Sequence, residues 1–218
     1  GMEIKTNTPK VLAARKTNLE LVLSNHERKC LSCVRSTNCE LQKLANEYGC
    51  EEGHFEGASV HYEKDESTAF LVRDNDKCIL CRRCVAACKN MQGIGVIGRG
   101  FDTHIGTLFE KKLAETSCIG CGQCIVACPV GALYEKDDTQ KVLDAIADPT
   151  KHVAICTAPS VRATLGECFG YEPGTDVEGK MVAAIKRLGF DGVYDMNLTA
   201  DLTIMEEATE FLDRVKNG

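Results

Sequence analysis

The chain has 218 residues, of which 44% are hydrophobic and 27% are charged, and its 26 basic and 32 acidic side chains leave a net charge of −6. This apolar content argues against a disordered chain, and no uninterrupted apolar run approaches the ~20 residues that a membrane span needs. The acidic balance argues against a nucleic-acid binder, because phosphate contacts need a surplus of Lys and Arg on one face.

The chain contains 14 cysteines. Whether they form disulfides or bind metal depends on the cell compartment of the protein. No charged-then-apolar leader of the signal-peptide type follows Met2, so we expect a cytoplasmic protein. In that reducing compartment a cysteine-rich pattern more often binds metal than forms disulfides. Both ends are expected to be cuts, because Gly1 before Met2 resembles the remnant of an expression tag and Gly218 directly follows a helical pattern.

The first elements are predicted from helical spacing of apolar residues. A helix is expected from about Pro9 to Asn25. A second helix, with Asn38 as its N-cap and Gly49 closing it, carries an apolar stripe that includes Leu41 and Tyr48. The acidic and polar segment 51–68 is predicted to be a linker.

Short strands are predicted around the later cysteines. Ala69 to Arg73 and Ala132 to Tyr134 each suggest a strand, and Gly93 to Phe109 suggests a hairpin that turns near Asp102. After about Asp138 the pattern changes.

The last part of the chain alternates strands and helices. We expect a buried strand at Val153 to Thr157, a helix at Val177 to Leu188, a strand at Gly192 to Met196 and a helix at Thr199 to Lys216 with Thr199 as its N-cap. This order predicts the opening of an α/β layer. Two strands cannot close a core, so the segment is expected to be part of a domain.

Two cysteine runs repeat one spacing, Cys-x2-Cys-x2-Cys-x3-Cys, and the second is followed by Pro129. This spacing is typical of two-cluster ferredoxins, in which the fourth cysteine of each run binds the other cluster. The predicted ligand sets are Cys78, Cys81, Cys84 with Cys128, and Cys118, Cys121, Cys124 with Cys88. Zinc sites and disulfides are the alternatives, but zinc uses CxxC pairs rather than this repeated run.

Residues beside the runs fit this interpretation. Gly120 and Gly122 let backbone N–H groups approach the sulfur atoms. Lys77, Arg82 and Arg83 place positive charge beside the first cluster, which is expected to raise its potential relative to the second.

A third ligand group comes earlier, with one imidazole and three thiols at His26, Cys30, Cys33 and Cys39. It predicts either a zinc site or an iron-sulfur cluster whose potential the neutral imidazole shifts upward. The other histidines lack neighbouring ligands and are expected to be ordinary polar or core residues: His54, His61, His104 and His152. Three cysteines have no ligand spacing and are expected to be buried free thiols: Cys50, Cys156 and Cys168.

Together, the one-His, three-Cys motif and the paired runs resemble an electron-transfer arm shared by three families. These are the iron-only (FeFe) hydrogenases, the large iron-sulfur subunit of respiratory complex I, and some formate dehydrogenases. Three later phrases resemble the start of the FeFe-hydrogenase catalytic domain, in the order of that family: Thr157 to Arg162, Glu178 to Ala184, and Ala200 to Glu210.

The resemblance implies an α+β fold in three parts. Residues 1–60 would form a His-ligated 4Fe-4S domain, 61–140 a bacterial-ferredoxin-like domain with two 4Fe-4S clusters, and 141–218 the first part of an α/β catalytic domain. Ala158, Pro159 and Ser160 match positions beside the six-iron active-site cofactor. Glu207 and Glu210 match acids of the proton path.

The resemblance also implies a function in anaerobic redox metabolism. Three 4Fe-4S clusters would carry electrons to the active site of an oxidoreductase that interconverts protons and dihydrogen. The expected partner is a redox carrier such as ferredoxin, or an NAD(P)H-oxidising subunit. The cysteines that hold the six-iron cofactor in the family are absent, so these residues alone are expected to be inactive. The alternative is an electron-transfer module of a complex I-like or formate dehydrogenase assembly.

Overall fold

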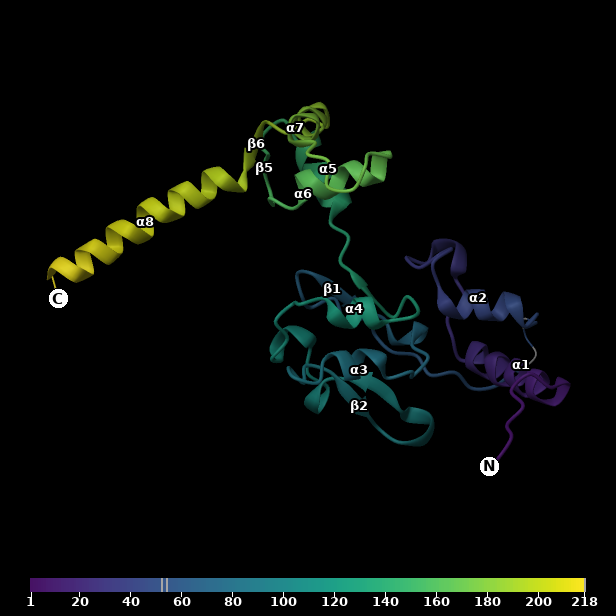
Figure 1. Cartoon of the computed structure of the whole chain (residues 1–218). Helices are drawn as coiled ribbons and strands as arrows, with labels where there is room; N and C mark the ends of the chain where they lie inside the picture. Colours follow the sequence, from purple (N-terminus) through teal and green to yellow (C-terminus); the bar gives the residue numbers. More distant parts are fainter. Residues whose placement is uncertain (52, 54, 218) are drawn as a thin grey trace. The chain divides into compact units, whose positions relative to one another are not determined.

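The computed structural model describes residues 1–51, 53 and 55–217, and these form two compact units, Gly1–Lys136 and Asp137–Gly218 (Figure 1). Each unit has its own helices and strands. Among the described residues, no helix is both long and apolar enough to cross a membrane.

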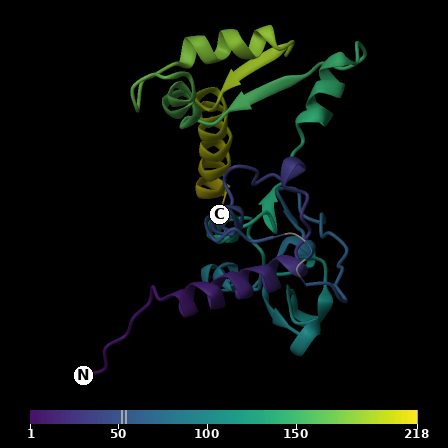
Figure 2. The same ribbon diagram turned by 90° about the vertical axis from the view of Figure 1, so that its right-hand side faces the viewer.

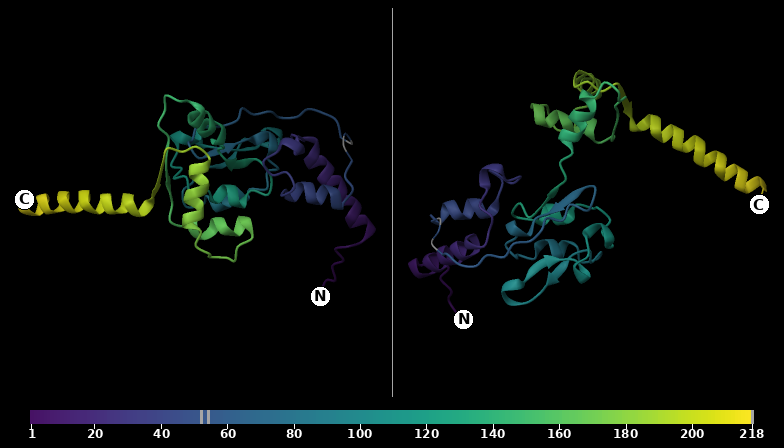
Figure 3. Two further views of the ribbon diagram at one scale, coloured as in Figure 1. Left: turned by 90° about the horizontal axis from the view of Figure 1, so that it is seen from above. Right: turned by 180° about the vertical axis from the view of Figure 1, so that it is seen from behind.

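Two helices that lie side by side open the first unit (Figure 3). Helix α1 (Pro9–Ser24) begins as predicted, because Pro9 suits the first helical position and Thr8 Oγ1 accepts a hydrogen bond from the Val11 N–H at 3.3 Å. Helix α2 (Glu40–Glu47) is also confirmed, but its N-cap is Cys39 rather than Asn38. The Pro129 carbonyl accepts a hydrogen bond from the Glu40 N–H at 3.1 Å, so this first N–H of α2 needs no side-chain cap.

The rest of the first unit includes two small antiparallel ladders and two short α-helices. Strand β1 (Leu71–Arg73) pairs with β4 (Leu133–Glu135), and β2 (Gly95–Ile97) pairs with β3 (His104–Gly106). The predicted strands and hairpin are therefore confirmed. Helices α3 (Arg83–Ala87) and α4 (Gln123–Ala127) pack against each other.

One hydrophobic core serves the whole first unit. Leu71 and Val130 are each only 1% exposed, and Leu41 of α2 belongs to the same cluster. The one-His motif and the two cysteine runs are thus held by a common core.

The described part of segment 51–68 is not a free linker. It contains no helix or longer strand, as expected, but hydrogen bonds attach it along the unit. The Val60 N–H donates to Asn25 Oδ1 at 2.9 Å, and the Tyr62 N–H donates to Asp76 Oδ1 at 2.8 Å. Asp65 forms an isolated antiparallel bridge with Arg73. We call residues 55–68 the strap.

The second unit contains the expected α/β arrangement. Strands β5 (Ala154–Thr157) and β6 (Gly192–Asp195) are parallel neighbours (Figure 2), and the connection between them contains α6 (Val161–Thr164) and α7 (Glu178–Arg187). Parallel strands need such a crossover connection. Helix α5 (Thr139–Ala147) precedes β5.

Two details of the second unit differ from the sequence prediction. Strand β5 is only partly buried, since Ala154 and Cys156 are exposed and Thr157 is buried. Helix α8 (Met196–Asn217) begins three residues before Thr199, whose hydroxyl donates to the Met196 carbonyl at 2.8 Å inside the helix instead of capping it. The apolar side chains of α8, including Met205, are exposed.

Arg162 connects three segments of the second unit. Its Nη1 lies 3.0 Å from Glu178 Oε2 on α7 and 3.0 Å from Asp195 Oδ2 at the end of β6. Its Nε donates to the Pro159 carbonyl at 3.3 Å. The side chain is 20% exposed, so water screens these interactions only in part.

Replacing Arg162 with methionine is expected to loosen this unit, because two carboxylates would lose their shared cation. We expect faster amide hydrogen exchange in β5 and β6 than in the unsubstituted chain. Arg187→Met is the matched control, because Arg187 is exposed at the end of α7. Equal exchange rates in the two variants would show that the ion pairs do not stabilise the unit.

Candidate metal centres

The first predicted ligand set lines one cavity. Cys78, Cys81, Cys84 and Cys128 surround it, together with apolar side chains such as Ile105. Burial, followed by the charges of the other three cysteines, raises the pKa of the Cys84 thiol to about 12. Thiols in such surroundings lose their protons when a cation binds them, which suits a metal centre.

The second predicted set is gathered around Cys124. Burial raises the pKa of its thiol, and the neighbouring Cys118 and Cys88 raise it further. Cys88 therefore lies near cysteines of the other run, as the crossed arrangement requires. Cys121 is exposed.

Both cysteine loops use the same backbone conformation, although their residues differ. Gly120 and Gly122 have φ values of +70° and +71°, and the equivalent Leu80 and Arg82 have +54° and +61°. Side chains rarely occupy this left-handed region. The first loop nevertheless adopts it, and its Leu80 N–H points to Cys78 Sγ at 3.4 Å.

The third predicted set also lines a cavity, which contains His26, Cys30, Cys33 and Cys39. Burial, helped by the nearby Lys77 ammonium, lowers the pKa of His26, so its imidazole is neutral at neutral pH. Its Nδ1 is buried and has no hydrogen-bond partner among the described residues. A neutral imidazole with an unused nitrogen fits a metal ligand. Across the residues that the structure describes, including all three predicted sets, no three His, Cys, Asp or Glu residues lie close enough to hold a single metal ion.

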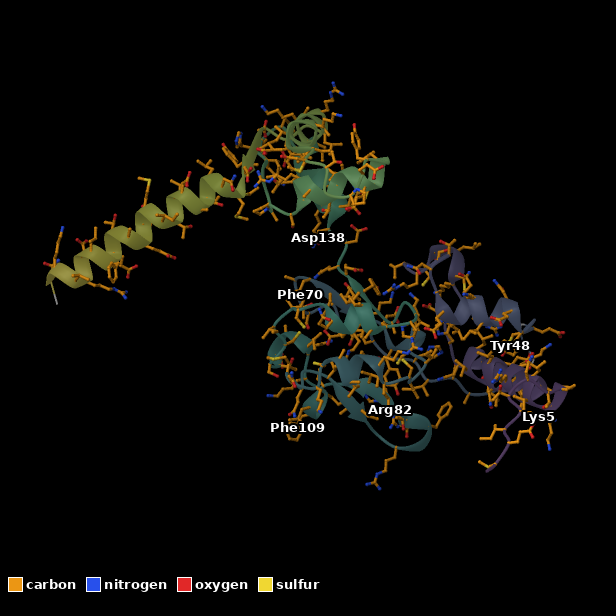
Figure 4. All side chains as sticks on the ribbon, viewed as in Figure 1. Lys5, Tyr48, Phe70, Arg82, Phe109 and Asp138 are labelled. Carbon is orange, nitrogen blue, oxygen red and sulfur yellow. The ribbon has the colours of Figure 1, made fainter. Side chains whose placement is uncertain are left out.

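Among the described residues, two of the three predicted cations are ion-paired and one is not. Lys77 pairs with Asp74 at 3.0 Å and Glu27 at 3.6 Å, and Arg83 pairs with Glu40 at 2.6 Å. Arg82, labelled in Figure 4, lines the first cavity and makes no ion pair within the described residues. Arg83 still interacts with the charges of Cys81 and Cys128, so the predicted positive charge beside the first ligand set is shared by Arg82 and Arg83.

The residues that matched the catalytic domain lie in the second unit. Ala158, Pro159 and Ser160 form the turn between β5 and α6. Glu207 and Glu210 are both exposed on α8, and Arg214 pairs with Glu210.

Several minor predictions are corrected. Cys156 and Cys168 are exposed rather than buried, and Cys50 is half-buried. His61 contacts Asp76 at 3.3 Å and His104 contacts Glu110 at 3.1 Å, as ordinary polar residues do. His54 lies outside the described residues.

Two residues near the third cavity had no signal in the cysteine spacing. Gly131 lines the cavity, and Arg35 donates from Nη2 to the Ile125 carbonyl of α4 at 3.0 Å. Both connect parts of the chain that are far apart in sequence.

Three family models match separate parts of the chain. "Iron only hydrogenase large subunit, C-terminal domain" matches residues 151–218. "NADH-ubiquinone oxidoreductase-G iron-sulfur binding region" matches residues 15–54, and "4Fe-4S dicluster domain" matches residues 77–132.

Individual proteins are similar over longer stretches. The NADP-reducing hydrogenase subunit HndD of Solidesulfovibrio fructosivorans is 51% identical over 99% of this chain, and Iron hydrogenase 1 of Clostridium pasteurianum is 43% identical over 100% of it. The chain spans only 37% and 39% of these two relatives. A crystal structure of an NAD+-reducing NiFe-hydrogenase in the H2-reduced state matches 62% of this chain and 59% of its own chain, with a TM-score of 0.58 and 28% identity.

Proposed function

We propose, from the FeFe-hydrogenase-like sequence that the chain carries over its whole length, that it conducts electrons through three 4Fe-4S clusters to a hydrogenase active site. The observation that carries the proposal is the convergence of the predicted ligands. The Cys78 set and the His26 set each line one cavity, and Cys88 lies with Cys118 and Cys124.

The donor chemistry supports clusters at all three places. Four thiolates are the usual ligands of a 4Fe-4S cluster, and His replaces Cys at some iron-sulfur centres with higher potential. A bound cluster supplies one-electron chemistry. The protein's own residues hold it, surround it with apolar side chains such as Ile105, and place the Arg82 charge at the first site.

Three domains follow from this assignment, at residues 1–60, 61–140 and 141–218. In a complete protein the six-iron cofactor would lie beside Ala158, Pro159 and Ser160. Glu207 and Glu210 would then carry protons, because their spacing places both carboxylates on one face of α8. The 218 residues by themselves are proposed to transfer electrons without producing or oxidising hydrogen.

An NAD(P)H-oxidising subunit or a ferredoxin is the proposed electron partner. The names of two similar proteins support this, since one is NADP-reducing and the other NAD+-reducing. A complex I-like or formate-oxidising module remains the second candidate because residues 15–54 match an iron-sulfur region of complex I. The match of residues 151–218 to iron-only hydrogenases favours the first candidate.

Metal analysis of the anaerobically reconstituted chain tests the three-cluster proposal. We expect about 12 irons and as much acid-labile sulfide per chain, with the Mössbauer spectrum of 4Fe-4S clusters. The protein should be brown and oxygen-sensitive. A colourless protein that contains zinc would contradict the cluster assignment.

A further inference from the structure

The cavity of His26 lies directly against the segment that follows Cys128. Gly131 lines this cavity, and a Cβ atom at Gly131 would lie 2.8 Å from Cys33 Sγ. The φ of Gly131 is not in the left-handed region, so the backbone itself does not demand glycine. The close approach of the Cys33 sulfur is what excludes a side chain.

A hydrogen bond joins the same two regions. The Glu40 N–H donates to the Pro129 carbonyl at 3.1 Å. Glu40 directly follows Cys39, and Pro129 directly follows Cys128. Two predicted ligands of different sites are therefore connected by two short stretches of covalent chain and one hydrogen bond.

Side chains hold this connection in place from both directions. Arg83, beside Cys84, forms a two-pronged ion pair with Glu40 at 2.6 and 2.8 Å. Arg35, between Cys33 and Cys39, donates to the Ile125 carbonyl of α4 at 3.0 Å. The Arg35 contact and the backbone hydrogen bond join the two ligand segments independently of the Glu40 side chain.

We propose that the electron path between the His26 site and the Cys78 site runs from Cys39 through the Glu40 N–H and the Pro129 carbonyl to Cys128. Because Gly131 has no side chain, Cys33 can lie against it, and this contact sets the distance between the two sites. The proposal rests on the proposed function. Along this path one electron leaves the reduced group at one ligand set and reduces the oxidised group at the other. No bond forms or breaks, and no proton is transferred.

Electron tunnelling falls steeply with distance and passes more readily through bonds and hydrogen bonds than through gaps. Removal of the hydrogen bond or enlargement of Gly131 should therefore slow the exchange. The first change removes the Glu40 N–H, and the second places a methyl group against the Cys33 sulfur.

The first test removes the Glu40 N–H by Glu40→Pro. Glu40 is the first residue of α2, where proline is well tolerated, and Cys39 already has the extended backbone that a residue before proline prefers. Glu40→Ala is the matched control, because it removes the same side chain and its ion pair but keeps the N–H.

The second test enlarges the contact by Gly131→Ala. The matched control is Gly95→Ala, because a Cβ at Gly95 would meet no atom within 4 Å and its φ is not positive. Alanine at Gly131 must displace the Cys33 sulfur, and with it the His26 site.

The measurement uses the reconstituted full chain at low concentration. A photoreduced deazaflavin, which is a one-electron donor, delivers less than one electron per chain, and samples frozen at successive times are examined by electron paramagnetic resonance. In the unsubstituted chain and both controls, the signals of the His26 and Cys78 sites should reach their final ratio in the first sample. In Glu40→Pro and Gly131→Ala we expect loss of this rapid exchange, with a ratio that changes over later samples.

Iron content distinguishes a failure of the proposed path from a failure of the proposed function. Either variant with full iron and rapid exchange would overturn the proposed path. An iron content of the unsubstituted chain far below about 12 would instead contradict the proposed function.

Discussion

A double replacement of Cys84 and Cys128 by alanine is expected to remove one 4Fe-4S cluster and to leave the other ferredoxin-type cluster intact. Both thiols line the same cavity, and burial places both among the least exposed cysteines. Two lost thiolates at one site leave too few ligands for a cluster, whereas the second site keeps all four. Mössbauer spectroscopy should show a loss of about four of 12 irons.

The replacement of Cys84 together with Cys88 is the decisive comparison. Cys84 lies on α3 and Cys88 directly follows that helix, but in the crossed arrangement they belong to different clusters. We therefore expect damage at both ferredoxin-type sites and no intact cluster at either. The reverse pattern, with two damaged sites in Cys84/Cys128 and one in Cys84/Cys88, would show that each run holds its own cluster.

The exposed Cys156 provides the control, since Cys156→Ala lies outside the three ligand sets. It should retain all of the iron. A loss of iron there would mean that cysteine replacement lowers cluster content for reasons unrelated to ligation.

The cysteine sets could be predicted as groups because their arrangement depends on local spacing. Three cysteines on one short loop point inward whatever surrounds them, so residues 78–84 and 118–124 specify their own geometry. The repeat then implies that the fourth cysteines are exchanged. The proximity of Cys88 to Cys118 and Cys124 agrees with that inference.

Contacts between distant segments could not be predicted in this way. Nothing in the sequence near Gly131 indicates that Cys33 lies against it, because that contact depends on how the first part of the unit packs on the common core. Helices α3 and α4 were also missed. Each has five residues, too few to show helical periodicity.

The sequence predicted which cations lie beside the first cysteine run, but not which carboxylates they pair with. Lys77 and Arg83 lie where expected in sequence, yet Asp74 and Glu40 neutralise them. The start of α8 was misplaced for a similar reason. Thr199 has the side chain of an N-cap, but its hydroxyl bonds to the Met196 carbonyl within a helix that has already begun.

Asp65 was hidden within a segment that the sequence suggested was a linker, and it is expected to be important for stability. It is 3% exposed. One carboxylate oxygen accepts from the Ser67 N–H at 3.1 Å and the Ser67 hydroxyl at 2.6 Å. The other accepts from the Leu113 N–H at 2.9 Å and from Arg73 Nη2 at 3.3 Å. The side chain therefore joins the strap to β1 and to the segment after β3.

The ionised form of Asp65 is the stable one in the folded chain. Burial alone raises its pKa, but the hydrogen bonds from Ser67 and Leu113 and the charge of Arg73 outweigh burial and lower the pKa from its ordinary value of 3.8. A carboxyl whose folded pKa is lowered stabilises the fold fully above its unfolded pKa. That contribution is lost as the pH falls through the folded pKa, so it is present in full at neutral pH.

Replacement of Asp65 by alanine is accordingly expected to cost about 3–5 kcal/mol at neutral pH, because it leaves the buried Leu113 N–H without its acceptor and removes the carboxylate that pairs with Arg73. Urea unfolding followed by circular dichroism should show a lower midpoint, and amide exchange in β1 should accelerate. Glu66→Ala is the matched control on the same strap, since Glu66 is exposed, and its effect should stay within about 0.5 kcal/mol. If both variants unfolded at the same urea concentration, the strap would not depend on Asp65 for its attachment.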